Sequence, residues 1–205
     1  MQREERSERS RRQVLDAALQ LFSRQGYRAT TVRDIADQAG VSTGNVYHHF
    51  PDKETIFRTL LEEYTTISAS TRSPFVRALR TGRFPDNLEA LGYAARDSVR
   101  QFRQYQALIF VDVIEFDGTH IRRFFADMSA RLAALLGDAD SLEEIRRRLR
   151  PGVSPMSALL IATRLFFGYF QLEILFGVPE PFGKESSEVV KEIADILRSG
   201  LLEKK

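Results

Sequence analysis

The side chains best suited to chemistry lie between residues 42 and 48, in the run STGNVYH. Asn45 carries an amide donor and a carbonyl acceptor, the pair that can bond to adenine N6 and N7 in the major groove of DNA. Thr43 can donate to a base or contact a thymine methyl group. Gly44 permits close backbone approach, although it costs a helix about 1 kcal/mol relative to Ala. These residues predict a short helix that reads base edges, with ordinary polar surface residues as the alternative.

The residues before this run predict the frame that would position it. Thr31 and Asp34 have the spacing of a capping box, which begins a helix. Ser42 is a typical N-cap for a second helix, and the sharp turn between the two requires a residue with positive φ. The small or apolar residues at the spacing of a DNA-binding helix-turn-helix are Ala36, Gly40 and Val46.

The flanking segments extend this pattern. Residues 12–26 (RQVLDAALQLFSRQG) repeat apolar residues at helical spacing and end in a glycine that can terminate a helix. Residues 47–54 (YHHFPDKE) end one helix and begin the next. Residues 14–57, VLDAALQLFSRQGYRATTVRDIADQAGVSTGNVYHHFPDKETIF, resemble the tetracycline-repressor (TetR/AcrR) family of bacterial transcriptional regulators. The run G-V-S-x-G-x-x-Y-x-H-F-x-x-K-E, from Gly40 to Glu54, is specific to that family.

The resemblance implies a set of DNA contacts. It places Tyr47, His48 and Lys53 on the phosphate backbone, with Thr31 beside it. Lys53 would lie in the first turn of a helix, where a phosphate could take charge from the lysine and hydrogen bonds from the helix amides. Arg28 and Arg33 are weaker candidates. The predicted DNA-binding residues are Thr31, Arg33, Ser42, Thr43, Gly44, Asn45, Tyr47, His48 and Lys53.

Composition sets the outer limits of the interpretation. With 205 residues, 43% of them hydrophobic, the chain can bury a substantial core. A formal net charge of +2 does not by itself indicate a nucleic-acid binder, but a small DNA-reading domain on a larger neutral body would give this value. The absence of cysteine excludes disulfides and zinc fingers and agrees with a cytoplasmic location.

The first thirteen residues, MQREERSERSRRQ, lack the apolar segment of a secretory signal. Their mixed charges favour a frayed, solvated end over an arm that contacts DNA.

Helical periodicity recurs along the whole chain, and no run alternates cleanly with period two. The expected fold class is all-α, with an N-terminal three-helix helix-turn-helix DNA-binding domain in residues 1–53. A helical bundle follows in residues 54–205, and the resemblance assigns ligand binding and dimerisation to it. The expected helices lie near 8–25, 32–39, 43–49, 53–70, 74–81, 86–102, 104–116, 119–136, 141–150, 155–176 and 185–203.

Three charged residues interrupt apolar runs of the bundle. Asp112 and Glu115 lie in the run ALIFVDVIEF, and Arg164 lies in the longest apolar stretch, residues 155–176. Buried charges need partners, so an ion pair between Arg164 and one of the acids is the favoured interpretation. Contact with the polar end of a ligand and exposure to water are the alternatives. His120 is expected to be a partly exposed surface residue.

The bundle is also rich in aromatic residues. At helical spacing these are typical of a core, but a ligand cavity of the kind that the family holds would be lined by some of them. The expected effector is an apolar or amphipathic small molecule. The predicted ligand-binding residues are Phe102, Tyr105, Phe110, Asp112, Phe116, Phe124, Arg164 and Phe167.

Residues 155–176 are apolar on all faces of the expected helix. Arg164, Gln171 and Glu173 argue against a membrane span, because charged and polar groups are expensive in hydrocarbon. A helix of this kind is covered by a core or by a second subunit. Residues 185–203 add an amphipathic stripe. The predicted homodimer interface contains Phe166, Tyr169, Phe170, Glu173, Ile193 and Leu197.

No enzyme signature is found, since the chain has no Gly-x-Ser-x-Gly, phosphate-binding glycine loop or His-Glu-x-x-His. The neighbouring His48 and His49 point apart on a helix, so no metal site or cofactor is expected. The expected function is a ligand-responsive regulator, most simply a repressor, that binds a palindromic double-stranded DNA operator as a homodimer and is released by its effector. One alternative is a helical small-molecule-binding protein that contacts DNA only through phosphates, and a helical enzyme is another.

Overall fold

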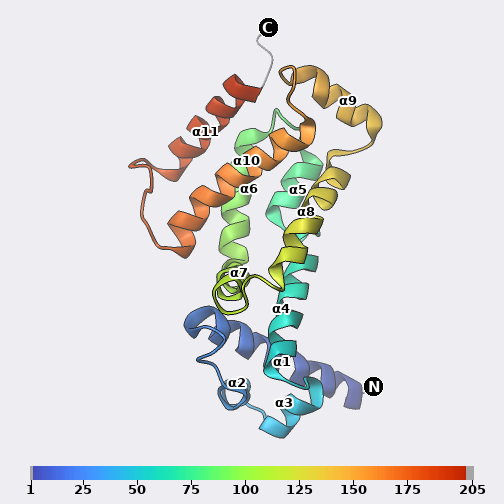
Figure 1. Cartoon of the computed structure of the whole chain (residues 1–205), viewed down its shortest axis with the longest axis vertical. Coiled ribbons are helices and arrows are strands. Elements are labelled where there is room, and N and C mark those ends of the chain that lie inside the picture. Colours follow the sequence, from blue (N-terminus) through green and yellow to red (C-terminus); the bar gives the residue numbers. More distant parts are fainter. Residues whose placement is uncertain (1, 202–205) are drawn as a thin grey trace. The chain divides into compact units, whose positions relative to one another are not determined.

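The computed structural model describes residues 2–201, with side chains for residues 4–126 and 130–200. All regular elements in this range are helices, which confirms the expected all-α fold (Figure 1). They are α1 (Gln2–Gln25), α2 (Val32–Ala39), α3 (Thr43–His49), α4 (Lys53–Ser68), α5 (Pro74–Thr81), α6 (Leu88–Gln101), α7 (Arg103–Glu115), α8 (Ile121–Leu136), α9 (Ala139–Arg148), α10 (Pro155–Phe170), the π-helical turn η1 (Gln171–Leu175) and α11 (Ser186–Leu201).

The helix boundaries differ from expectation mainly at two places. The first helix begins at Gln2 rather than near residue 8, so the segment expected to be a frayed end is helical. The expected helix 155–176 is α10 followed by the wider π-helical turn η1. The intervening Gly26 and Gly40 have φ of +85° and +67°, as helix-terminating glycines require.

The described residues form two compact units. Unit 1 comprises the chain up to Thr66 together with Gln104–Phe124, and unit 2 comprises Ile67–Arg103 and the chain from Phe125 onward. Unit 1 therefore holds α1, α2 and α3, most of α4 and α7, and the turn from α7 into α8. Unit 2 holds α5, α6, α9, α10, η1 and α11, with most of α8.

In unit 1, α1 packs against both α2 and α3. Its apolar residues recur at helical spacing and point inward, because Val14, Ala18 and Phe22 are each fully buried. Ile35 on α2 and Val46 on α3 complete this small core. The packing leaves the opposite faces of the two short helices free for another task.

In unit 2, α6 is the central helix and contacts α5, α10 and α11 (Figure 1). Gly92 of α6 makes this approach possible, because a Cβ there would lie 2.7 Å from the Val190 side chain and 2.8 Å from the Phe166 ring. A core of 22 buried residues drawn from these helices and from α8 and α9 holds the unit together.

One segment, Pro155–Leu175, is long and apolar enough to cross a membrane by length and composition alone. In unit 2 one side of it belongs to the core, where Leu159, Phe166 and Phe170 are fully buried. Its other side exposes Ile161 and Leu165. A partly covered apolar helix of this kind occurs in the core of many soluble proteins.

Candidate nucleic-acid interface

Helix α2 is fixed at both ends by its own sequence. The Thr31 hydroxyl accepts from the Asp34 amide at 3.1 Å, and the Asp34 carboxylate accepts from the Thr31 amide at 2.8 Å, which confirms the capping box. These hydrogen bonds lower the pKa of Asp34 below its usual value. At the other end Gly40 adopts the left-handed conformation, and the space around it is open, so its role is conformational.

Helix α3 begins with the expected cap as well. The Ser42 hydroxyl accepts from the amide of Asn45 at 3.1 Å. Val46 and Ala36 are each 1% exposed, and α3 packs against α2, as the helix-turn-helix pattern predicts. The turn between the helices is therefore set by local hydrogen bonds and by two small contact residues.

The remaining surface of α3 carries the polar residues. Ser42, Thr43, Gly44 and His48 are exposed, and the Tyr47 side chain is 55% exposed. A Cβ at Gly44 would meet only the Ser42 hydroxyl, at 3.8 Å, so the surface there is open. These five residues form one accessible helix face, which we call the recognition face.

Asn45 is the exception among the predicted base readers. It is only half-exposed, and its carbonyl oxygen Oδ1 accepts from the hydroxyl of Ser10 on α1 at 2.5 Å. This bond orients the carboxamide and uses one of the two lone pairs of Oδ1, while the Nδ2 amide keeps its donors. Bidentate bonding to adenine would share Oδ1 with Ser10. The sequence held no sign of this tertiary contact, because Ser10 lies 35 residues away.

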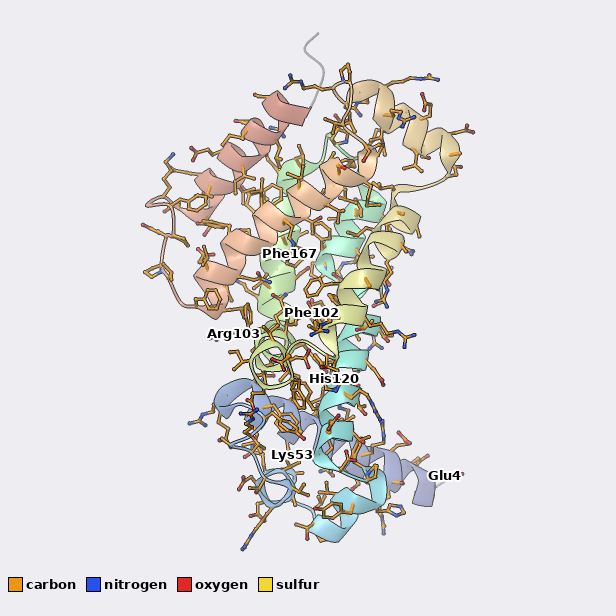
Figure 2. The ribbon with its side chains drawn as sticks, in the orientation of Figure 1. Glu4, Lys53, Phe102, Arg103, His120 and Phe167 are labelled. Carbon is orange, nitrogen blue, oxygen red and sulfur yellow. The ribbon has the colours of Figure 1, made fainter. Side chains whose placement is uncertain are left out.

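Lys53 is held by the turn between α1 and α2. Its ammonium group donates to the carbonyl oxygens of Tyr27 at 2.8 Å and Thr30 at 2.6 Å, and it lies 4.1 Å from the centre of the Tyr27 ring. Burial lowers the pKa of Lys53, against the attraction of Glu115 and Asp34. One of its three N–H groups remains for another partner. Figure 2 labels Lys53 at the beginning of α4.

The arginines around the motif are more accessible than Lys53. The Arg33 side chain is 85% exposed with Asp37 at 3.9 Å, and the Arg28 side chain is 80% exposed. Arg11 lies over the Phe50 ring, 5.2 Å from its centre. Exposed guanidinium groups near the recognition face can meet phosphates without a large desolvation cost.

The predicted ligand-binding residues are divided between the two units. In unit 1 the Tyr105 hydroxyl donates to Glu63 at 2.8 Å, and burial with this contact raises the pKa of Tyr105 to about 12. Phe124 stacks on Tyr64 with ring centres 5.5 Å apart. Phe116 packs on Phe57, Tyr27 and His120, while Phe110 is 36% exposed.

The three charged residues of the apolar runs have other partners than expected. Asp112 is fully buried and accepts from the amide of Ile121 at 2.9 Å, while its other oxygen lies 2.6 Å from His120 Nδ1. Arg164, in unit 2, is exposed and lies over the Phe125 ring at 5.3 Å. The expected ion pair between Arg164 and an acid of residues 107–116 is therefore wrong, because both acids are satisfied within unit 1.

His120 also differs from expectation. Its side chain is 12% exposed, between Asp112 and Glu54, whose carboxylate lies 3.6 Å from Nε2. Glu115, the second acid, is bound to two backbone amides of unit 1. Among the described residues, no group of three His, Asp or Glu side chains could hold a metal ion.

In unit 2 the remaining predicted ligand residues are packed rather than open. Phe102 is 5% exposed, and Phe167 lies against Phe75 with ring centres 5.2 Å apart. A separate cavity of about 500 Å³ lies in this unit, and none of the predicted ligand residues lines it. Its buried apolar residues include Leu79, Phe84, Leu136 and Ile145, and its charged residues are Arg80, Arg83, Glu144 and Arg148.

The predicted dimer residues are mostly part of the core of unit 2. Phe166, Tyr169, Phe170, Ile193 and Leu197 are each at most 7% exposed within the chain itself, which leaves them almost no surface for a partner. Glu173 is half-exposed and accepts from the Ser186 hydroxyl. The exposed apolar residues on the same elements are Ile161, Leu165, Leu172 and Ile196, at 38% to 62% exposure.

Comparison with known proteins locates the strongest similarity in the region of the recognition face. The model of the family described as "Bacterial regulatory proteins, tetR family" matches residues 14–60. The HTH-type transcriptional repressor KstR2 of Mycobacterium tuberculosis is 40% identical over 89 residues, which cover 40% of this chain and 44% of that protein. The AcrR regulator of Shigella flexneri is 43% identical over 56 residues, 27% of this chain and 26% of its own length. The matches thus span less than half of these relatives.

Solved structures extend the similarity of fold to the whole chain. A TetR family transcription regulator from Marinobacter aquaeolei has a TM-score of 0.69 with 16% identity and full coverage of both chains. The ketosteroid transcriptional regulator KstR2 of Mycobacterium tuberculosis has a TM-score of 0.60 with 20% identity over 95% of both chains. Residues 14–60 thus match the tetR family of bacterial regulatory proteins, and the whole chain shares the fold of these solved structures.

Proposed function

We propose that this chain is a cytoplasmic transcriptional repressor that binds a palindromic operator in double-stranded DNA as a homodimer and is released by a small molecule. The observation that carries the proposal is the recognition face of α3. Five exposed residues, four of them with polar side chains, stand on a helix whose cap and inner contacts are those of a helix-turn-helix. One of the matched relatives, KstR2 of Mycobacterium tuberculosis, is named an HTH-type transcriptional repressor.

In this proposal some residues of the recognition face contact base edges and others contact the phosphate backbone. Thr43 and Gly44, near the N-terminus of α3, approach the base edges, because this end of a recognition helix enters the major groove. Tyr47 and His48 contact the phosphate backbone, together with Arg33 and the Thr31 end of α2. Ser42 serves mainly as the N-cap of α3, and its exposed side chain can also contact a phosphate.

Asn45 and Lys53 have narrower roles than their residue types suggest. Asn45 offers its Nδ2 amide, a donor, to a base acceptor or a phosphate oxygen, while its carbonyl oxygen is shared with the Ser10 hydroxyl. Lys53 contacts a phosphate through the one N–H that Tyr27 and Thr30 leave free. Both residues therefore combine a structural contact with a DNA contact.

The homodimer forms through the exposed apolar side of α10, η1 and α11. Ile161, Leu165, Leu172 and Ile196 are exposed among the residues that the structure describes. Paired about a two-fold axis, two copies of these helices make a four-helix contact that removes this surface from water. Two recognition helices can then meet half-sites about 34–36 Å apart, or a multiple of that distance.

The effector is an apolar or amphipathic molecule bound in the helical body. The cavity of unit 2 adds a candidate place for it, since about 500 Å³ lies within the usual range of small-molecule sites. Buried leucine, isoleucine and phenylalanine residues line this cavity together with Arg80, Arg83 and Arg148, of which Arg83 pairs with Glu144 and Arg148 with Asp86. An amphipathic acid would place its tail on the apolar residues and its charge among the arginines.

The competing function is a helical ligand binder that contacts DNA only through phosphates. Selection of bound sequences from a random pool of duplex DNA by the full-length chain separates the two. The proposal predicts enrichment of a palindrome, while the competitor predicts a pool that remains random although it is retained. Thermal-shift screening of fatty acids, their thioesters, aromatic acids and cationic drugs, followed by operator release, then tests for an effector.

A further inference from the structure

The turn between α1 and α2 is held by a carboxylate from another part of unit 1. Glu115, the last residue of α7, accepts from the amide of Tyr27 at 2.9 Å through Oε1 and from the amide of Arg28 at 2.7 Å through Oε2. Its side chain is only 14% exposed. The two oxygens thus bind two successive backbone amides, an arrangement known from anion-binding backbone concavities.

Gly26 makes room for this carboxylate. Its φ of +85° directs the next amides toward Glu115, and a Cβ at this position would lie 2.7 Å from Glu115 Oε1. A side chain there would therefore be strained by the backbone and would also displace the carboxylate. Gly26 and Glu115 are 89 residues apart in the sequence, and the glycine leaves the space that the carboxylate occupies.

Lys53 binds the carbonyl oxygens of the same turn. Glu115 accepts hydrogen bonds from the amides of the turn, and Lys53 donates hydrogen bonds to the carbonyl oxygens of Tyr27 and Thr30. The Tyr27 ring is also packed against Phe116, the residue after Glu115, with ring centres 4.6 Å apart. Backbone donors and acceptors of residues 27–30 are therefore bound by two opposite charges, one at the end of α7 and one at the start of α4.

The position of this turn sets the position of the recognition face. Thr30 is fully buried, and the next residue, Thr31, caps α2. Helix α2 in turn packs against α3, and Ala36 and Val46 are buried on the two helices. A shift of residues 27–30 would be passed to α3, because packed helices move as rigid elements rather than deforming continuously.

We propose that Glu115 is a positioning residue for DNA binding, which holds the turn between α1 and α2 so that α3 is presented in register with the operator. The inference rests on the proposed DNA-binding function. It makes the end of α7 a second attachment of the helix-turn-helix, in addition to the start of α4. A movement of α7 would then alter operator affinity through the Glu115 contacts.

The test compares Glu115→Ala and the isosteric Glu115→Gln with the control Glu62→Gln in the full-length chain. Glu62 is an exposed carboxylate on α4, with Arg58 at 3.9 Å. Affinity is measured for a selected operator and for a non-specific duplex. We expect Glu115→Ala to weaken operator binding about tenfold, as two charge-assisted hydrogen bonds are lost. Glu115→Gln, which keeps one acceptor oxygen, should fall between it and the wild type, and Glu62→Gln should match the wild type.

The non-specific duplex separates positioning from a general loss of folded protein. A misplaced α3 loses base contacts but can still meet phosphates, so non-specific affinity should stay within about twofold. Equal losses on both duplexes, or an unchanged operator affinity, would overturn the inference. If Glu115→Ala is insoluble, Glu115→Gln carries the same comparison. A wild-type chain that binds no selected sequence would instead refute the proposed function itself.

A double-mutant cycle with Gly26→Ala tests the contact directly. If the alanine acts partly by displacing the carboxylate, its effect on operator affinity must shrink once Glu115 is already Ala. We expect the loss caused by Gly26→Ala to be at least threefold smaller in the Glu115→Ala background. Fully additive effects would show that the two residues act separately and would contradict the proposal.

Discussion

The helix-turn-helix of unit 1 and the helical bundle of unit 2 are stabilised in different ways. Helices α2 and α3 have eight and seven residues, too short to be stable alone, and hydrogen-bonded caps hold their ends. Unit 2 depends instead on a large shared core around α6. A region fixed by local hydrogen bonds keeps its outer face free for specific contacts, whereas a region fixed by apolar packing tolerates many sequences.

The same contrast appears in the comparisons. Identity with relatives reaches 40% to 50% only in matches of 54 to 89 residues, and the matched family region ends at residue 60. Structures that cover the whole chain are 16% to 23% identical. Caps and turns demand particular residues, while a core demands only apolar side chains of suitable volume.

The largest expected effect is a loss of core packing in unit 2. Phe166 is fully buried and its neighbour Leu165 is 44% exposed, which makes them a matched pair on α10. Phe166→Ala should lower the free energy of unfolding by about 3–5 kcal/mol. Leu165→Ala should change it by about 0.5 kcal/mol or less in the monomer. Chemical denaturation followed by circular dichroism measures both, and similar losses would show that the core assignment is mistaken.

The next effect concerns the proposed dimer. Leu165→Glu places a charge on the exposed apolar side of α10 without touching the core of its own chain. A central apolar contact in an interface contributes about 2 kcal/mol or more, so sedimentation at micromolar concentration should detect monomers. Operator affinity should fall with dimerisation. A variant that remains dimeric would place the interface elsewhere, and a monomeric wild type would remove the dimer from the proposal.

A smaller effect is expected at the half-exposed Asn45. Asn45→Ala should weaken operator binding by roughly 1–3 kcal/mol and relax the preference at one base position of each half-site. Ser10→Ala removes the hydrogen bond that orients the Asn45 carboxamide, and it should weaken operator binding by about 1 kcal/mol. Titration against operators varied one position at a time measures both changes. Unchanged base preference in Asn45→Ala would limit this residue to its contact with Ser10.

Lys53→Ala separates the structural contact of Lys53 from its phosphate contact. Loss of the bonds to Tyr27 and Thr30 should lower the free energy of unfolding by about 1–3 kcal/mol. Loss of one phosphate contact should flatten the slope of log K against log salt by about 0.9 for every DNA sequence. A lower free energy of unfolding with an unchanged salt slope would limit Lys53 to a structural role in the turn.

The smallest expected effect is a pH dependence at His49. Burial, followed by repulsion from His48 and Arg11, lowers the pKa of His49 below 6.5. The folded state therefore binds this proton less readily than the unfolded chain. Its contribution to stability is present above about pH 6.5 and is lost as the pH falls. His49→Gln should reduce the loss of thermal stability between pH 8 and pH 5, and an identical pH profile would contradict this assignment.

The sequence predicts the features that depend on neighbouring residues better than those that depend on tertiary packing. Thr31, Gly40 and Ser42 act through neighbours within a few residues, so their roles could be derived from spacing alone. The bounds of most helices followed from periodicity and punctuation in the same way. The wider η1 turn did not, because no residue type specifies a π-helical turn.

Contacts between distant residues were beyond such reasoning. Asp112 and Glu115 were identified as charges that need partners, but their partners, His120 and the amides of Tyr27 and Arg28, depend on the tertiary fold. Likewise, the apolar pattern predicts cover on all faces of residues 155–176. It cannot show that Phe166 faces its own core while Leu165 faces outward.

The central claim is that the recognition face of α3 reads a DNA sequence. The most direct measurement is the ratio of wild-type affinities for the selected operator and for a scrambled duplex, determined across a range of salt concentrations. The account predicts a ratio of about 10³ or more that persists when salt has weakened both complexes. A ratio near one, with affinities that follow salt alone, would contradict it.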